Sequence, residues 1–163
     1  MNSARNMNVV QCHNVCNGHP RALVDSGAGT CLLGNEFYIE PRSTDQLITM
    51  QGFAGPSYKV DCLPVGIGIA AVDLPDGVVL VRVNEGIIAP YQSILSANQL
   101  RSYSTTVDDC PKTYGDSQKI VIDNGPTLPL HYISGLCYLP IRKPTMVEEM
   151  QDLPIHDITS GMP

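Results

Sequence analysis

Short apolar runs separated by turn-forming residues are the feature that most constrains how this chain can fold. The sequence contains fourteen glycines and thirteen prolines, and its apolar runs are short and end at Gly, Pro, Asn or Asp. Runs with such boundaries are typical of β-strands. They are Ala22–Val24, Thr30–Leu33, Leu47–Met50, Val65–Val72, Val78–Val83, Lys119–Ile122 and Leu136–Ile141. We therefore predict many short strands and no long helix.

Turn signals accompany these runs. Asp76-Gly77 lies between two β-branched runs, and Asn124-Gly125 follows another. Both dipeptides accept the positive φ angles that tight turns require. The pair Gly66-x-Gly68 lies inside an apolar run with no helix pattern after it. We interpret this pair as a strand kink rather than a phosphate-binding loop.

Two segments are predicted to be helical. Ser93–Tyr103 can hold a short helix around Ala97–Leu100, with Ser96 as its N-cap. Thr145 precedes Glu148 by three residues, the spacing of a capping box that opens a short acidic helix. The fold class that follows is all-β with one or two short helices.

Composition limits the classes of function. The chain has 163 residues, a formal charge of −6 and a pI near 5.0. The length fits one ordinary domain, and the acidic balance excludes a large basic surface for nucleic acid. No apolar run reaches the roughly 20 residues that a membrane span needs. We see no signal peptide, interpret the six cysteines as reduced thiols, and expect an intracellular protein without nucleic-acid or membrane partners.

One tripeptide, Asp25-Ser26-Gly27, is a candidate catalytic motif. It directly follows the apolar run Ala22–Val24, and small residues follow it. A carboxylate at the end of a buried strand is fixed by the core yet emerges into a loop. About 0.1 occurrences of Asp-[Ser/Thr]-Gly are expected by chance in a chain of this composition, so the tripeptide alone is moderately informative. The simpler interpretations, a turn between two strands or a loosely matching phosphodegron, stay open.

The segment Ala22–Ala28 resembles the active-site segment of retropepsin-like aspartic proteases, particularly those of copia-type retrotransposons. Ser93–Leu100 is similar to the Leu-Leu-Ser-x-x-Gln-Leu segment late in the same proteases. Val107–Pro111, Leu136–Thr145 and His156–Ser160 resemble elements of diatoms and other microbial eukaryotes. The resemblance covers about residues 21–160. At Ile94–Ser96 the chain departs from ordinary retropepsins, which have two hydrophobic residues and a glycine there, and is similar to the copia-type proteases.

The resemblance implies a homodimeric aspartic endopeptidase with a closed, β-barrel-like retropepsin fold. Two carboxylates must share one proton, one acting as general base on water and the other as acid. The chain has a single Asp-[Ser/Thr]-Gly motif, so a second copy must supply the second Asp25. Ser26 would brace the pair, and Gly27 would present its backbone to the substrate. No cofactor and no metal is expected, because the nucleophile is water.

Substrate contacts and domain limits follow from the same resemblance. Ala28 would contact the peptide or polyprotein substrate, and a flap would close over it with Gly52, Phe53 and Gly55. We expect a polar N-terminal arm at 1–20, the protease domain at 21–144, and an acidic helix followed by a tail or linker at 145–163. Action in the cytoplasm, inside virus-like particles of the element, is the implied location.

Three alternatives remain at this point. The chain can be a catalytically inactive retropepsin-like domain that dimerises or binds, or an all-β binding domain unrelated to proteases. The third alternative is a zinc site in the N-terminal segment, since Cys12, Cys16 and His19 are residue types that bind zinc. Their spacing does not match the retroelement zinc knuckle, and we expect a polar arm instead.

Overall fold

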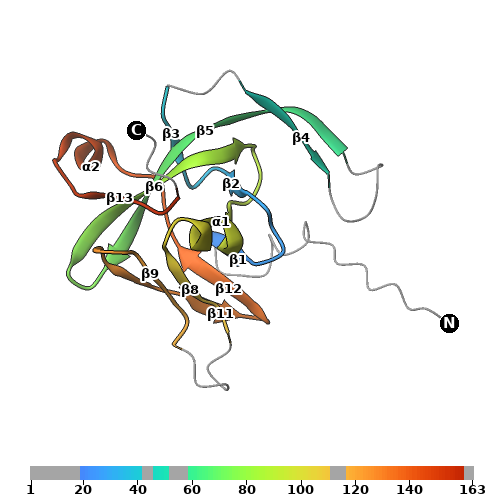
Figure 1. The fold of residues 1–163 in the computed structure, drawn as a ribbon. Coiled ribbons are helices and arrows are strands. Elements are labelled where there is room, and N and C mark those ends of the chain that lie inside the picture. Colours follow the sequence, from blue (N-terminus) through green and yellow to red (C-terminus); the bar gives the residue numbers. More distant parts are fainter. Residues whose placement is uncertain (1–18, 42–45, 52–58, 111–116, 160–163) are drawn as a thin grey trace.

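A ten-stranded sheet organises the chain, and a three-stranded sheet accompanies it (Figure 1). The computed structural model describes residues 19–41, 46–51, 59–110 and 117–159. The main sheet has the order β11-β12-β1-β7-β2-β6-β5-β3, with β13 on β6 and β4 on β5, and the small sheet is β10-β9-β8. The elements are β1 (Arg21–Asp25), β2 (Cys31–Leu33), β3 (Tyr38–Ile39), β4 (Leu47–Gln51), β5 (Lys59–Leu74), β6 (Gly77–Ile88), β7 (Ile94–Ser96), α1 (Ala97–Ser102), β8 (Thr106–Asp108), β9 (Lys119–Val121), β10 (Thr127–Pro129), β11 (His131–Ile133), β12 (Leu136–Pro140), α2 (Met146–Met150) and β13 (Ile155–Asp157).

Strand β1 lies inside the main sheet, between β12 and β7. It pairs antiparallel with β12 and parallel with β7. Ala22, Leu23 and Val24 are all buried, as expected for a strand that is covered on both faces. The strand that leads to Asp25 is therefore fixed by neighbours on both edges and by the core.

The hydrophobic core joins the two sheets. One connected cluster of buried side chains includes Val24 of β1, Leu95 of β7 and Leu100 of α1, together with Ile120 and Leu128 of the small sheet. Leu95, Leu100, Ile120 and Leu128 have no exposed surface. The small sheet and α1 are thus packed onto the part of the main sheet that carries Asp25.

The long hairpin β5–β6 confirms the predicted turn and kink. Leu74 pairs with Gly77. Gly77 has a φ of +134°, a conformation that glycine adopts with little strain. The register shifts between Gly66 and Gly68. At Gly68 an added Cβ would lie 2.9 Å from the ring of Phe37, so the close packing of this kink excludes a side chain.

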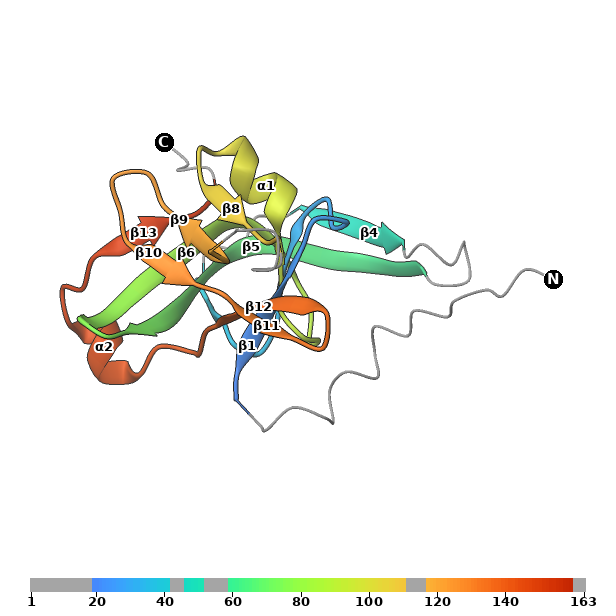
Figure 2. The same cartoon turned by 90° about the horizontal axis from the view of Figure 1, so that it is seen from below.

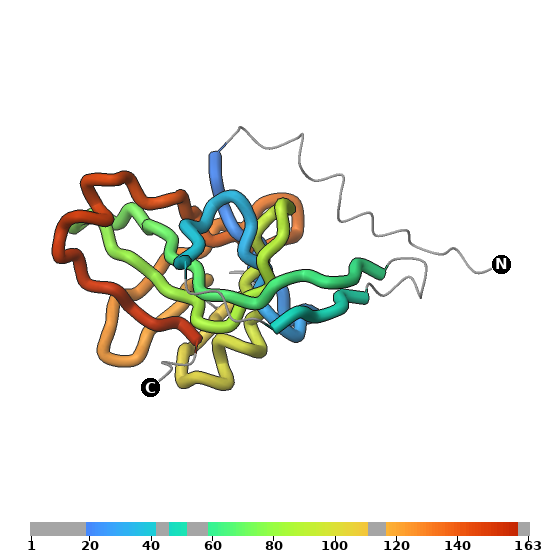
Figure 3. The backbone as a smooth tube through the Cα atoms, turned by 90° about the horizontal axis from the view of Figure 1, so that it is seen from above, coloured from blue at the N-terminus to red at the C-terminus, as the bar shows by residue number. Residues whose placement is uncertain are grey.

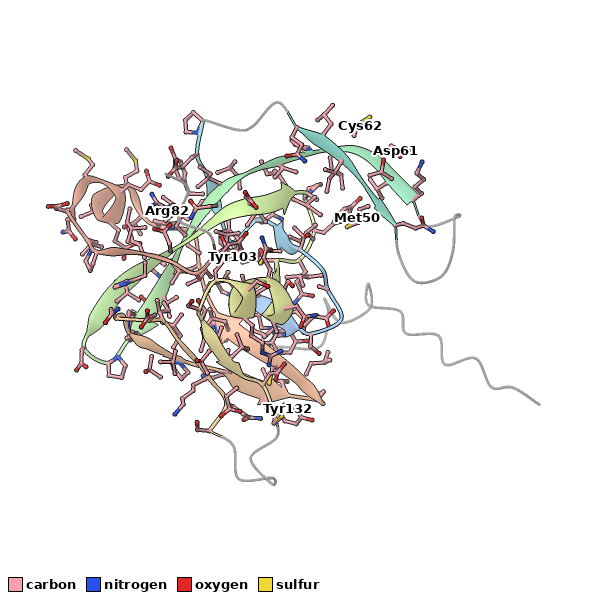
Figure 4. All side chains as sticks on the ribbon, in the orientation of Figure 1. Met50, Asp61, Cys62, Arg82, Tyr103 and Tyr132 are labelled. Atoms are coloured by element: carbon pink, nitrogen blue, oxygen red, sulfur yellow. The ribbon has the colours of Figure 1, made fainter. Side chains whose placement is uncertain are left out.

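Strands β4 and the first half of β5 form an arm that extends away from the rest of the described chain (Figures 1, 2 and 3). Figure 4 labels Met50 on β4 and Asp61 and Cys62 on β5. The helix α2 lies at the opposite end of the molecule from this arm (Figures 1 to 3). Residues 52–58, which join the two strands, lie outside the described residues.

Both predicted helices and their caps are confirmed. The side chain of Ser96 accepts a hydrogen bond from the Gln99 amide at the start of α1. Thr145 and Glu148 form the complete capping box of α2. The all-β class with short helices is therefore confirmed. Among the described residues, no helix is long and apolar enough to cross a membrane.

Two expectations differ from the structure. Within the described part of the chain the main sheet is open, ending at β11 and β3, so the expected closed barrel is not formed there. The segment expected to be a tail instead supplies β13, which pairs parallel with β6. Ile158 follows β13 and has no exposed surface, which explains why this short segment packs on the sheet rather than extending into solvent.

Candidate active site

Asp25 lies at the carboxyl end of β1, where the chain leaves the core. Its pairing partner across the parallel β7 strand is Ser96, the last residue of β7 and the N-cap of α1. Asp25 is half-buried, whereas Ser26 and Gly27 are exposed. The carboxylate thus stands on a rigid strand end and can be reached from solvent.

The loop after β1 holds the carboxylate through its own backbone. Asp25 Oδ1 accepts a hydrogen bond from the Gly27 amide at 2.7 Å. This is the bond of an Asx turn, so the simpler interpretation of the motif as a turn fits the geometry as well. A Cβ at Gly27 would lie only 3.1 Å from Oδ1, which explains why glycine suits this position.

Three side chains from the start of α1 bind the main chain of the same loop. Ser96 Oγ donates to the Ala28 carbonyl at 2.6 Å, and Asn98 Nδ2 donates to the Ser26 carbonyl at 2.6 Å. Gln99 Oε1 accepts from the Cys31 amide at 2.7 Å. We call Ser96, Asn98 and Gln99 the loop clasp. Figure 2 shows the β1–β2 loop beside α1, which makes these contacts possible.

The loop clasp is itself anchored to the sheet. Gln99 Nε2 donates to the Glu85 carbonyl in β6 at 2.8 Å, and the Ser96 amide donates to Cys31 Sγ at 3.3 Å. Burial raises the pKa of the Cys31 thiol to about 12, which outweighs the opposite effect of that amide. Cys31 is therefore a neutral packing residue and not a nucleophile.

Of the other predicted site residues, the structure describes Ala28 but not the flap residues. Ala28 is half-buried and lies in the clasped loop with Asp25, Ser26 and Gly27. The flap residues Gly52, Phe53 and Gly55 lie outside the described residues. So do Cys12 and Cys16 of the zinc alternative. Across residues 19–159, where they are described, no group of three or more His, Cys, Asp or Glu side chains is placed to hold a metal ion.

A cluster of apolar residues connects the β4–β5 arm to the strand beside Asp25. Leu32, Ile87 and Ala89 are buried in it, and partly buried neighbours pack against them. These neighbours include Met50 from the arm and Ile94 from β7. Ile94 pairs with Leu23, two residues before Asp25, so the apolar cluster borders the candidate site.

A pocket lies at the other end of β1. Arg21, His131 and Tyr138 are among the residues that line it, and the Arg21 guanidinium lies 4.4 Å from the centre of the Tyr138 ring. Asp25 does not line this pocket. This pocket and the candidate catalytic carboxylate are therefore separate features.

The sequence alone does not indicate that the loop clasp belongs to the candidate site. The sequence predicts a helix cap at Ser96, and it indicates no role for Asn98 and Gln99 beyond their place in the Ser93–Leu100 segment that resembles copia-type proteases. A signal was present, because polar residues directly follow the apolar Ile94-Leu95 at the end of a strand. Assigning it to the loop after Asp25 requires the parallel pairing of β1 with β7, which local sequence does not give.

We compared the chain with protein-family models, with curated proteins and with solved structures, and none of them matches it.

Proposed function

We propose that this chain is an aspartic endopeptidase of a retrotransposon-type polyprotein, active as a homodimer. The observation that carries the proposal is the position of Asp25. It ends a strand that is held on both edges, in an Asp-Ser-Gly loop clasped by three side chains, and the residue is half-buried. Rigid placement and access are what a catalytic carboxylate needs.

In the proposed mechanism the two Asp25 carboxyl groups of the dimer share one proton. The ionised group takes a proton from water, which attacks the scissile carbonyl carbon, and the protonated group donates to the carbonyl oxygen. Collapse of the tetrahedral intermediate breaks the C–N bond. The carboxyl group that took the proton from water gives it to the leaving nitrogen, and the ionised partner takes a hydroxyl proton from the intermediate, which leaves the pair with one shared proton. Ser26 braces the pair, and Gly27 and Ala28 line the path of the substrate backbone.

The substrate is proposed to be a peptide segment of the chain's own polyprotein inside the cell. The flap of Gly52, Phe53 and Gly55 would close over it from the β4–β5 arm. The apolar cluster around Leu32 and Ile94 supports this proposal, because it offers apolar contacts between the arm and the strand beside Asp25. No nucleic acid, cofactor or metal enters the proposed reaction.

The test is cleavage of an unbiased peptide mixture between about pH 4 and 7, the range in which a shared-proton carboxylate pair works. Wild type, Asp25→Asn and Asp76→Asn would be compared, each with its sedimentation profile. Asp76 is exposed in the β5–β6 turn and is a matched control for the loss of one carboxylate. We expect cleavage by dimers of wild type and Asp76→Asn only. A folded wild type that is as inert as Asp25→Asn would instead support the inactive dimerising or binding domain.

A further inference from the structure

We propose that Gln99 and Asn98 are positioning residues for the Asp25 carboxylate. This inference rests on the proposed function and adds to it the residues that set the catalytic geometry. Neither side chain is required to touch substrate. They act on the main chain of the loop, and the loop acts on Asp25.

A series of contacts leads from the loop clasp to Asp25. Oδ1 is oriented by the Gly27 amide, so the position of this amide decides where the carboxylate points. The amide lies between the carbonyls of Ser26 and Ala28. Each of these carbonyls accepts a hydrogen bond of 2.6 Å from the loop clasp, through Asn98 and Ser96 respectively. A movement of α1 relative to the loop would therefore shift the Ser26 and Ala28 carbonyls, and with them the Gly27 amide that orients the carboxylate.

Gln99 has two hydrogen-bonding roles. Its amide oxygen holds the Cys31 amide at the far end of the loop, and its amide nitrogen holds the Glu85 carbonyl of β6. A primary amide is the side chain that can accept at one position and donate at the other without charge. Gln99 thus connects the loop to the sheet, and it fixes the end of the loop that Asn98 does not reach.

The side chains of the loop clasp stand on a well-packed part of α1. Ala97 and Leu100, on either side of Asn98 and Gln99, have no exposed surface. Ser96 is also fully buried, and its hydroxyl caps the helix. A site residue is positioned well only when its supporting side chains are themselves held by packing. The base of α1 meets this condition, and Asn98 itself is exposed, so changing it leaves the core intact.

The variants separate hydrogen bonding from packing. Gln99→Met keeps the length of the side chain and removes both bonds. Gln99→Glu keeps the acceptor for Cys31 at every pH, and its carboxyl group can donate to the Glu85 carbonyl only when protonated. Asn98→Asp replaces the donor to Ser26 with an acceptor. Gln151→Met and Asn35→Asp are matched controls at exposed positions.

The experiment measures kcat, KM, the melting temperature, the sedimentation profile and the hydrogen exchange rate of the Cys31 amide for each variant. We expect Gln99→Met and Asn98→Asp to lower kcat about 10- to 100-fold, the effect of misplacing a reacting group by up to about 1 Å, with KM changed less than about twofold. The Cys31 amide should exchange faster in Gln99→Met and at the wild-type rate in Gln99→Glu. The controls should match wild type.

The pH dependence gives a readout that a purely structural role would not change. The ratio of Gln99→Glu to wild-type kcat should rise towards one as the pH falls to about 4, near the ordinary pKa of a glutamate, because the protonated acid restores the donor. Gln99→Met should show no such recovery. An active wild type with unchanged kcat in Gln99→Met and Asn98→Asp would overturn this inference alone. An inert wild type would overturn the proposed function, and unchanged Cys31 exchange in Gln99→Met would then overturn the clasp itself.

Discussion

The loop that carries Asp25 and the C-terminal segment that carries Asp157 are held by different kinds of contact. Asp25 accepts a main-chain amide, and its loop is clasped by the uncharged side chains of Ser96, Asn98 and Gln99. Asp157 instead forms two hydrogen bonds with Arg82, at 2.7 and 3.0 Å, and one with Asn84. Uncharged groups hold Asp25 and its loop, and Asp25 is only half-buried, whereas Asp157 is paired with the charged guanidinium of Arg82.

The two kinds of contact differ in how they respond to pH. Burial by itself would raise the pKa of Asp157, but the hydrogen bonds from Arg82 and Asn84 outweigh it and hold the pKa below its usual value. This contact stabilises the fold and weakens in acid. The hydrogen bonds from Ser96, Asn98 and Gln99 to the loop main chain involve no titratable group, so these contacts are expected to persist at the acidic pH where a shared-proton pair works.

The largest expected effect comes from replacing each of the two aspartates in turn by asparagine. Asp25→Asn should lower cleavage by about 10²- to 10⁴-fold, the contribution of a general acid–base group, with a nearly unchanged free energy of unfolding. Asp157→Asn should keep kcat and lower the free energy of unfolding by about 1 kcal/mol, because a hydrogen-bonded ion pair is weakened. Peptide cleavage and urea denaturation measure the two quantities. Loss of stability in Asp25→Asn with activity retained would reverse the assignment.

The next effect concerns the packing of the C-terminal segment. Ile158 has no exposed surface, and its carbonyl accepts a hydrogen bond from Thr105. Ile158→Ala should lower the free energy of unfolding by about 2–5 kcal/mol, since it removes buried volume from the core. Ile155→Ala is the matched control, because Ile155 is 43% exposed. Equal urea midpoints for the two variants would show that this segment does not belong to the core.

A smaller effect is expected where the loop backbone approaches Asp25. Gly27→Ala places a methyl group 3.1 Å from Oδ1, so the carboxylate must move by a few tenths of an ångström. We expect kcat to fall about tenfold, given that about 1 Å of misplacement costs about 100-fold. Gly29→Ala meets no atom within 4 Å and should behave as wild type. Equal kcat values for both variants would contradict the tight placement of the carboxylate.

The smallest effect is the acid sensitivity of the ion pairs near α2. Arg142 hydrogen bonds both Asp73 and Glu148, and it lowers the pKa of Glu148 to about 2. Because the folded pKa lies below the unfolded value of about 4.3, the stabilisation is present above that value and is lost as the pH falls towards 2. The free energy of unfolding should therefore decrease less steeply between about pH 4 and 2 in Glu148→Gln than in wild type.

The matched control for that comparison is Glu149→Gln, which changes an exposed neighbour on the same helix. Its denaturation free energy should follow the wild-type slope. Parallel slopes for wild type and Glu148→Gln would show that the Arg142 contact does not contribute to stability in this pH range.

Local chemistry was enough to predict much of this fold. The apolar runs, the cap at Ser96, the capping box at Thr145 and the turn at Gly77 each depend on residues close in sequence, and each is confirmed. The strand β13 could not be predicted in this way. Its residues Ile155–Asp157 form no apolar run, and its ion pair with Arg82 joins positions 75 residues apart.

The candidate site shows the same limit. Asp25 is recognisable because an apolar strand precedes it, and the structure places it at the end of β1. The role of Gln99 depends on a contact with Cys31, 68 residues earlier in the chain. Gln99 lies in the Ser93–Leu100 segment that resembles copia-type proteases, but the segment alone does not indicate which main-chain atoms the side chain contacts.

The most direct test of the central claim, that two Asp25 carboxylates form one site, uses mixed dimers. Wild type and Asp25→Asn would be unfolded together, refolded at several ratios with the total concentration fixed, and assayed for peptide cleavage. Our account predicts that the rate follows the square of the wild-type fraction, because only dimers with two Asp25 residues are active. A rate that falls linearly with the wild-type fraction would show that each chain acts alone and would contradict the account.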